Sequence, residues 1–171
     1  SVSAFLLNRS SDLSSCKSSE TALNKISFQA KKGQTIGIIG GTGDGKSTLV
    51  NLIPRFYDVD EGVVKVDGVD VIDYPLAQLR DKIGIVPQKA VLFAGTIEEN
   101  LRWGNAEATE DELWNALALA QATDVVKEKA EGLKYSIEQG GKNLSGGQRQ
   151  RLAIARALVK NPYILILDDS A

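Results

Sequence analysis

The sequence predicts an α/β fold, in which apolar strands are followed by helices and one long stretch is entirely helical. Three observations support this prediction. A short apolar segment, residues 35–39, leads through a glycine-rich turn into a helical pattern that begins at Lys46. A second helical pattern starts at Thr96 and continues for several turns. Near the end of the chain, residues 163–167 are continuously apolar, which is typical of a parallel strand that is covered on both faces.

Composition limits the classes of protein to consider. The chain has 171 residues, a net charge of −2 and one cysteine, Cys16. This length predicts one domain that buries about 70% of its unfolded surface. The balanced charge argues against a nucleic-acid partner, and a single cysteine fits a reducing compartment. No apolar run approaches the ~20 residues that span a bilayer, and no signal-peptide pattern is present. We therefore expect a soluble, cytoplasmic chain.

The elements before the glycine-rich turn are predicted from composition and alternation. Residues 1–20 are serine-rich, and we expect them to be mostly irregular, with a weak strand possible at Val2–Leu7. Residues 22–30 alternate apolar and polar side chains, which predicts a half-buried strand. Residues 35–39 then predict a short buried strand.

Turn and cap signals place the later elements. We expect a hairpin over 63–71 that turns at Asp67-Gly68, a short helix over 76–82 and a strand over 83–86. Thr96 and Thr109 are each followed three residues later by glutamate, the pattern of a helix start with a capping box. The expected order of these remaining elements is helices starting near Thr96 and Thr109, a loop at 140–143, a helix from Gly146 to about Lys160 capped by Ser145, and the strand 163–167.

The glycine-rich turn carries the strongest chemical signal. The spacing Gly40-x-x-x-x-Gly45-Lys46-Ser47 matches a phosphate-binding loop at every fixed position. Successive backbone N–H groups of such a loop form an anion nest, Lys46 is expected to reach the β- and γ-phosphates, and Ser47 to hold Mg²⁺. An ordinary glycine-rich turn would not explain the flanking strand and helix patterns. The predicted nucleotide-binding residues here are Gly40, Gly41, Thr42, Gly43, Asp44, Gly45, Lys46, Ser47 and Thr48.

Asp44 is unusual in this loop because it brings a carboxylate into a site built for anions. Its side chain either points to solvent, where screening weakens its effect, or points inward, where it opposes phosphate binding. We predict that Asp44→Ser tightens the binding of Mg-ATP.

Two further segments carry candidate chemistry. Asp168 ends an apolar strand, the place where open α/β sheets bind ligands, and its carboxylate can hold Mg²⁺; Asp169 can orient an attacking water. The alternative is an acidic strand end in solvent. The segment 144–151 starts a helix with glycines and the cap Ser145, which predicts a second anion site unless it is merely a capped helix start. Two such sites suggest either two ligands or one ligand shared in a dimer.

Taken together, the loop at 40–48, Gln88 after a short strand, Leu144–Gln148 and the strand to Asp168 resemble the nucleotide-binding domain of ABC transporters in order and spacing. The resemblance covers about residues 21–171 and is closest to the exporter branch of multidrug half-transporters. It implies a P-loop NTPase core with a RecA-like sheet, an N-terminal antiparallel β part and an inserted helical signature subdomain over about 89–155.

The resemblance also implies a mechanism. Two nucleotide-binding domains, in a homo- or heterodimer, enclose two ATP molecules with Mg²⁺, and each ATP lies between one phosphate loop and the partner's signature helix. ATP binding closes this dimer, and hydrolysis reopens it to power export at the cytoplasmic face of the membrane. The helical segment of about 89–143 contacts the transmembrane domain. The implied residues are Ser145, Gly146, Gly147 and Gln148 for ATP, Ser47, Gln88 and Asp168 for the metal, and Asp169 and Gln88 for catalysis.

Departures from the family pattern favour a second interpretation. Asp169 stands where the family has glutamate, and a shift of about 1 Å in the water-orienting group can cost about 10²-fold in rate. The chain then resembles the degenerate half of a heterodimeric exporter, which binds ATP with little hydrolysis of its own. No adenine-stacking aromatic matches, since Phe5 lies far upstream, and the family's switch histidine is absent. The chain resembles a fragment without the family's C-terminal third. A related ATPase of chromosome maintenance or DNA repair is the third interpretation, although heptads are missing.

Overall fold

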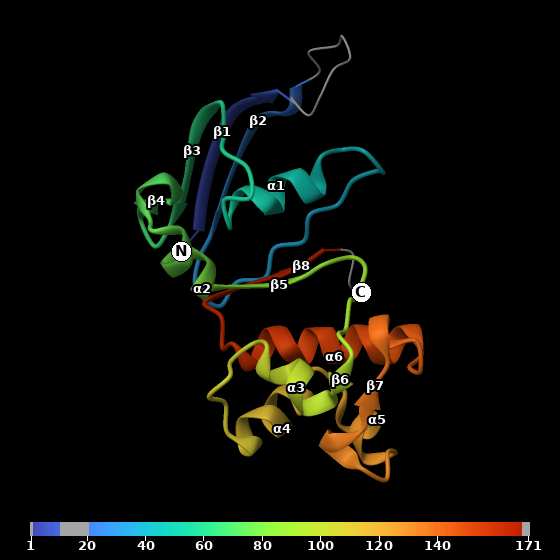
Figure 1. The fold of residues 1–171 in the computed structure, drawn as a ribbon. Helices are drawn as coiled ribbons and strands as arrows, with labels where there is room; N and C mark the ends of the chain where they lie inside the picture. The colour runs from blue at the N-terminus through green and yellow to red at the C-terminus, as the bar shows by residue number, and fades with distance from the viewer. Residues whose placement is uncertain (1, 11–20, 169–171) are drawn as a thin grey trace. The chain divides into compact units, whose positions relative to one another are not determined.

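The structure, a computed structural model, describes residues 2–10 and 21–168 (Figure 1). The chain forms two compact units, Ser1–Arg80 and Asp81–Ala171. Helices and strands both occur in each unit, so the predicted mixed α/β class is confirmed. Over the described ranges, no helix combines the length and the apolar character needed to cross a bilayer.

An antiparallel sheet dominates the first unit. The strand order is β2-β1-β3-β4, and β1 pairs with β2 on one side and with β3 on the other. The four strands are β1 (Val2–Ser10), β2 (Thr21–Ala30), β3 (Glu61–Val66) and β4 (Val69–Asp70). The predicted strand over 22–30 is confirmed, and its described side chains from Lys25 to Ala30 alternate between exposed and half-buried.

Strand β1 corrects the expectation of a mostly irregular N-terminus. Val2 lies opposite Ala30 in β2 and opposite Val66 in β3, and the strand continues to Ser10. Pairing on both sides provides backbone hydrogen bonds that the composition of the segment itself does not reveal, because strand formation depends strongly on neighbouring strands. Residues 11–20, including Cys16, lie outside the described part of the chain.

The predicted hairpin is confirmed at its turn. Lys65 lies opposite Asp70, and Val66 opposite Val69, so Asp67 and Gly68 form a two-residue connection. Both have positive φ, 56° and 82°, as a type I′ turn requires. Asp tolerates this left-handed conformation better than most residues, and glycine adopts it without a steric penalty.

The helix after the glycine-rich loop is also confirmed. It is α1 (Lys46–Leu52), whose Leu49 and Leu52 are buried. A 3₁₀ turn, η1 (Val71–Asp73), and the predicted short helix, α2 (Leu76–Asp81), follow β4. The buried apolar side chains of this unit are Leu23, Leu49, Leu52, Ile53, Val64, Val66, Val71 and Leu79.

Residues 35–39 do not form the predicted buried strand. The segment has no strand assignment, and its side chains are exposed, with Ile39 at 99% relative exposure. A strand needs a hydrogen-bonded neighbour, and this segment pairs with none of the four strands in the sheet of the same unit. The prediction is therefore wrong in both parts, because residues 35–39 are neither a strand nor buried.

The helices of the second unit pack together around its longest helix, α6. Figure 1 shows α3 and α4 beside α6, with β5 packed against the same helix. The helices are α3 (Ile97–Arg102), α4 (Glu110–Leu119), α5 (Thr123–Lys127) and α6 (Gly146–Val159), with the 3₁₀ turns η2 (Gly132–Lys134) and η3 (Gln139–Gly141). Buried apolar side chains from these elements, among them Ile97, Leu113, Leu117 and Leu152, form one core.

All three predicted helix caps are confirmed. The side chains of Thr96, Thr109 and Ser145 each accept a hydrogen bond from the backbone N–H three residues on, and each residue donates its own backbone N–H to the side chain at that position, which completes a capping box. This local chemistry fixes the starts of α3, α4 and α6, because it satisfies backbone donors that the helix itself leaves free.

Both strands predicted over 83–86 and 163–167 are confirmed, as β5 (Ile83–Val86) and β8 (Ile164–Leu167). The structure adds that they pair with each other in parallel, in register from Ile83↔Ile164 to Val86↔Leu167. The expected coverage on both faces is wrong for β8 within its own unit. Ile166 is buried, whereas Leu165 and Leu167 are 38% and 52% exposed. Only one face of β8 is packed, because the side chains of a strand alternate between its two faces. A second short ladder joins β6 (Gly95–Thr96) to β7 (Ser136–Ile137).

Candidate functional site

The predicted phosphate loop lies directly before α1. Gly43 and Gly45 have φ values of 92° and 80°, a left-handed conformation that glycine adopts at little cost. Gly45 caps the helix through its backbone, and its carbonyl accepts the Leu49 N–H at 2.8 Å. Ser47 is exposed and Thr48 is half-buried on the first turn. The glycines of the predicted loop therefore adopt turns that most other residues would make only at a steric cost.

Lys46 lies along this loop. Its Nζ donates to the carbonyl oxygens of Gly40 and Gly41, at 2.8 and 2.6 Å. The ammonium group of Lys46, at the end of the loop, is thus held by the two glycines at its beginning. A cation in this position can attract an anion that enters the loop.

Asp44 adopts the inward of the two expected orientations. One oxygen of its carboxylate accepts a hydrogen bond from the Gly41 N–H. Glycine at position 40 leaves room for this carboxylate, because a Cβ on residue 40 would lie 2.8 Å from Asp44 Oδ2. The residue remains exposed to solvent while its carboxylate holds the Gly41 N–H.

The second unit places two other predicted residues at one sheet edge. Asp168 follows β8, and its N–H donates to the Val86 carbonyl at 3.0 Å, which extends the parallel ladder by one step. Gln88 follows β5 after Pro87 and is exposed, whereas Asp168 is half-buried. Both residues therefore follow the carboxyl ends of neighbouring parallel strands, where α/β sheets bind ligands. Asp169 lies outside the described residues.

The predicted signature segment forms the start of α6. Ser145 Oγ accepts the Gln148 N–H at 3.2 Å, and Gln148 Oε1 accepts the Ser145 N–H at 3.0 Å. Ser145, Gly146 and Gly147 are exposed, and Gln148 is half-buried. The capping box thus holds the helix start rigidly while leaving its first glycines accessible.

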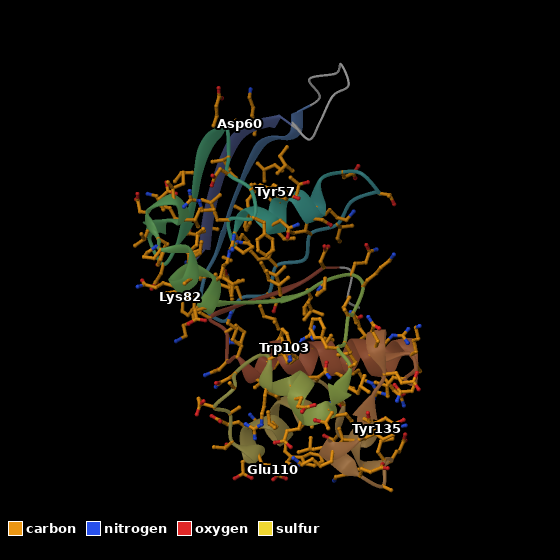
Figure 2. The ribbon with its side chains drawn as sticks, viewed as in Figure 1. Tyr57, Asp60, Lys82, Trp103, Glu110 and Tyr135 are labelled. Atoms are coloured by element: carbon orange, nitrogen blue, oxygen red, sulfur yellow. The ribbon has the colours of Figure 1, made fainter. Side chains whose placement is uncertain are left out.

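Sequence analysis missed the residues that hold this helix start in place. Arg149 Nη1 donates to the carbonyls of Leu144 and Gly141, at 2.7 and 3.2 Å. Asn143 accepts the Glu138 N–H at 3.0 Å and donates to the Ser136 carbonyl at 2.8 Å and to the Tyr135 hydroxyl at 3.2 Å. Tyr135 is labelled in Figure 2. These bonds span five to eight residues, so no helical or strand periodicity could have revealed them.

Two more missed residues connect the segment after Gln88 to the helices. Asn100 is 3% exposed; its amide accepts from the Phe93 N–H at 2.9 Å and donates to the Phe93 and Thr96 carbonyls at 2.9 and 3.0 Å. Arg156 Nη2 donates to the Val91 carbonyl at 3.0 Å. Burial lowers the pKa of the Arg156 guanidinium. Both side chains fix the backbone of the segment that leads from Gln88 into α3.

An aromatic pair lies on the surface beside these bonds. The rings of Phe93 and Trp103 stack at a centroid distance of 4.5 Å and an interplanar angle of 21°. The Arg156 guanidinium lies 5.7 Å from the centroid of the Phe93 ring. Trp103, at the end of α3 (Figure 2), is 69% exposed, and Phe93 is 42% exposed. Large exposed aromatic side chains of this kind are enriched at protein interfaces.

The predicted site residues thus fall into two groups. Residues 40–48 lie together in the first unit, and the second unit contains Gln88, Asp168 and the start of α6. Within the second unit, the β5–β8 ladder brings Gln88 and Asp168 to one edge, and α6 presents residues 145–148 separately.

Comparisons with known proteins identify the family of the chain. A sequence profile of the ABC transporter family matches residues 23–171. The chain is 50% identical over 149 residues to YfiB, an ABC transporter ATP-binding protein of Bacillus subtilis, with 87% of this chain and 26% of YfiB covered. It is 47% identical over 149 residues to NdvA of Rhodopseudomonas palustris, a β-(1→2)glucan export ATP-binding/permease protein, with 87% of this chain and 25% of NdvA covered.

A solved structure gives the same result for the fold. The chain matches a bacterial Atm1-family ABC exporter with ATP bound, with a TM-score of 0.89 and 37% sequence identity over 99% of this chain and 29% of that one. The chain spans about a quarter of the length of these curated relatives. On these grounds the chain belongs to the ABC transporter family, as an ATP-binding domain of the exporter type.

Proposed function

We propose that this chain binds Mg-ATP at residues 40–48 and hydrolyses it in a dimer of two nucleotide-binding domains, which powers export. The observation that carries the proposal is the loop itself. Left-handed glycines, a lysine lying along the backbone and an immediately following helix together form a binding site for phosphate groups. The finer fold that we propose around this site is a RecA-like core with an inserted helical signature subdomain.

The second domain of the dimer is proposed to use the start of α6. Ser145, Gly146 and Gly147 are exposed, and the capping box fixes their backbone. A preorganised helix start attracts anions through its free N–H groups and its dipole. In the proposed dimer, Ser145 and Gly147 contact the γ-phosphate of the ATP that is bound to the partner's loop, with Gln148 holding the cap.

The protein residues proposed to hold Mg²⁺ are Ser47, Gln88 and Asp168. They offer a hydroxyl, an amide and a carboxylate oxygen, and Mg²⁺ prefers oxygen ligands supplied by few protein groups together with substrate phosphates. Asp168 also lies at the carboxyl end of a parallel strand, where its carboxylate is half-buried. When bound, Mg²⁺ would neutralise phosphate charge as it develops during transfer.

The proposed membrane partner is the transmembrane domain of the same exporter, which would place this chain at the cytoplasmic face of the membrane. Support comes from NdvA, which is an ATP-binding/permease protein. We propose that residues 89–143 form the contact with this domain. The exposed stacked pair of Phe93 and Trp103 lies in this segment, and Asn100 and Arg156 hold its backbone.

Thermal unfolding with and without Mg-ATP tests the proposed binding site. Ligand at about 100 times its Kd stabilises a folded binder by about 2.7 kcal/mol, so the unfolding midpoint of the chain should rise. Lys46→Ala should abolish the rise, because it removes the cation that accompanies the phosphates. A rise of equal size in Lys46→Ala would contradict binding at this loop.

The second candidate function is a degenerate, regulatory half of a heterodimeric exporter. It is favoured by Asp169, which replaces the longer carboxylate of the family pattern, and by the inward position of the Asp44 carboxylate. Hydrolysis by the full-length protein and by its Asp169→Glu variant separates the two functions. A rate that rises by about 10²-fold in the variant supports the degenerate half, and equal rates support the active ATPase.

A further inference from the structure

The Gly40-Gly41 end of the phosphate loop is occupied by the loop's own side chains. The Gly41 N–H donates to the Asp44 carboxylate, and the carbonyls of Gly40 and Gly41 accept from Lys46 Nζ at 2.8 and 2.6 Å. An anion and a cation of the chain are therefore already bound to the backbone that the proposed function assigns to nucleotide phosphates. The Gly41 N–H therefore has an anionic acceptor before any ligand arrives.

The approach of the carboxylate depends on missing side chains. An ideal Cβ on Gly40 would lie 2.8 Å from Asp44 Oδ2, and one on Gly41 would lie 3.3 Å from the same atom. The first distance is too short for a real Cβ contact, so the glycines that leave room for phosphate oxygens also leave room for a carboxylate oxygen. Asp44 can reach this position because its own N–H points back to the Gly41 carbonyl at 3.4 Å, which closes a tight turn.

Phosphate and carboxylate oxygens make the same demand on a backbone N–H group. A charged acceptor forms a stronger hydrogen bond than a neutral one, so a phosphate cannot share the Gly41 donor without displacing Asp44. After displacement, the carboxylate stays near the entering phosphates, where like charges repel. Both effects lower affinity, and the repulsion increases with the charge of the ligand.

We propose that Asp44 determines nucleotide affinity by acting as an internal competitor for the phosphate groups of Mg-ATP. The inference rests on the proposed function, because it concerns the same loop. Mg-ATP can bind only to those molecules in which the Asp44 carboxylate has left the Gly41 N–H. The apparent affinity for Mg-ATP is therefore reduced in proportion to the fraction of such molecules. The displaced carboxylate lowers the affinity for Mg-ATP more than the affinity for Mg-ADP, because ATP brings one more charged phosphate close to it.

Titration calorimetry with Mg-ATP and Mg-ADP on the full chain tests this inference. Asp44→Ser removes both the acceptor and the charge, and Asp44→Asn keeps an oxygen acceptor of similar size while removing the charge. We expect the Kd for Mg-ATP to fall about tenfold in Asp44→Ser, which corresponds to about 1.4 kcal/mol, and to fall less in Asp44→Asn. The Kd for Mg-ADP should fall less than that for Mg-ATP in both variants.

The matched control is Asp73→Asn, which removes one exposed carboxylate of the same unit outside the loop. It should bind Mg-ATP as the unsubstituted chain does, and an equal gain there would show that only net charge matters. An independent readout is the amide resonance of Gly41 in ¹⁵N–¹H spectra. It should move upfield when Asp44→Asn weakens the charge-assisted bond, even if Asp44→Ser does not fold.

The possible failures are distinguishable. The proposed competition by Asp44 is contradicted if Asp44→Ser and Asp44→Asn bind Mg-ATP with unchanged affinity while Lys46→Ala still abolishes binding. In that case the proposed binding site itself stands. Binding that is insensitive to Lys46→Ala overturns the proposed binding site itself. A Gly41 resonance that is the same in the unsubstituted chain and in Asp44→Asn overturns the competitor on structural grounds.

Discussion

Arg156 Nη2 donates to the backbone carbonyl of Val91 at 3.0 Å, which ties the last turns of α6 to the segment that follows Gln88. The two residues are 65 positions apart in the sequence. One helix therefore carries the signature residues at its first turn and a support for the Gln88 segment near its other end. This relationship leads to the first prediction.

Arg156→Ala should destabilise the chain by about 2 kcal/mol, because it removes a charge-assisted hydrogen bond and the packing of a half-buried side chain against Phe93. Urea unfolding monitored by circular dichroism measures the change. Arg151→Ala on the same helix is the control. Its partner Asp124 is exposed, so solvent screening should make the loss of stability there much smaller than in Arg156→Ala. Equal losses in the two variants would argue against a special role for Arg156.

Asn100→Ala should cost about 2–3 kcal/mol, because two backbone carbonyls and one N–H around Phe93 and Thr96 lose their partner in a buried setting. The measurement is the midpoint of thermal unfolding, which should fall by several degrees. Asn105→Ala, at an exposed position, should change the midpoint little. If both variants unfold at the same temperature, the Asn100 network contributes no net stability.

Ser145 has a structural and a proposed functional role that two variants can separate. Ser145→Ala removes the N-cap, which should cost about 1 kcal/mol, and Ser145→Asp keeps a capping oxygen but adds negative charge. We expect both variants to reduce ATP hydrolysis by the full-length protein strongly, whereas only Ser145→Ala loses stability. Normal hydrolysis by Ser145→Asp would contradict a contact with the partner's γ-phosphate.

Trp103→Ala should leave the stability of the chain within about 1 kcal/mol, since the indole is mostly exposed. It should nevertheless lower ATP hydrolysis by the full-length protein in lipid vesicles, with the Kd for Mg-ATP unchanged, if Phe93 and Trp103 contact the transmembrane domain. Leu119→Ala on α4 is the control, because Leu119 is an apolar residue of similar exposure, 65%. The contact is excluded if both variants hydrolyse ATP at the rate of the unsubstituted protein.

Glu98 gives a prediction for pH dependence. Hydrogen bonds from Lys134, at 2.6 Å, and from Arg102, at 3.0 Å, lower the pKa of its carboxyl from the ordinary 4.5. Because the pKa of Glu98 is lower in the folded state than in the unfolded state, its ionised carboxylate stabilises the fold at pH values above the unfolded-state pKa. This stabilisation is lost as the pH falls through the folded-state pKa.

The unsubstituted chain should therefore be more stable than Glu98→Gln at neutral pH, by about 0.5 kcal/mol for such a partly exposed pair. The difference should vanish in acid, below pH 4.5. Thermal unfolding of both chains between pH 3 and pH 7 measures it. A difference that stays constant over this range would show that the charge of Glu98 is unimportant.

Local chemistry explains what could be predicted from the sequence. The helix starts at Thr96, Thr109 and Ser145 were predictable because a capping box lies within four residues, and the hairpin was predictable because Asp67-Gly68 determines its own turn. Strand β1 and residues 35–39 were not, because pairing depends on segments that are distant in sequence. The outcome for the two was opposite: the serine-rich segment forms a strand, and the apolar one does not.

The site shows the same division. The spacing of residues 40–48 predicted the loop, and alternatives for Asp44 followed from its charge, but the choice between them needed the structure. Arg149 and Asn143 could not be found, because an arginine or asparagine that bonds to distant carbonyls has the same sequence signature as one on an ordinary surface. The family pattern pointed to residues 145–147 as ATP contacts, which stays a prediction, and it did not indicate the side chains that hold them.

The junction of α3 and α6 has a mechanical consequence. A Cβ on Gly104 would lie 2.2 Å from the Arg156 carbonyl oxygen, so the backbone just after Trp103 touches the backbone of α6 with no side chain between them. Packed protein interiors have low compressibility and transmit strain. A displacement of Trp103 would therefore move α6 as a rigid body, including its other end at Ser145, because no side chains lie between the two backbones to rearrange.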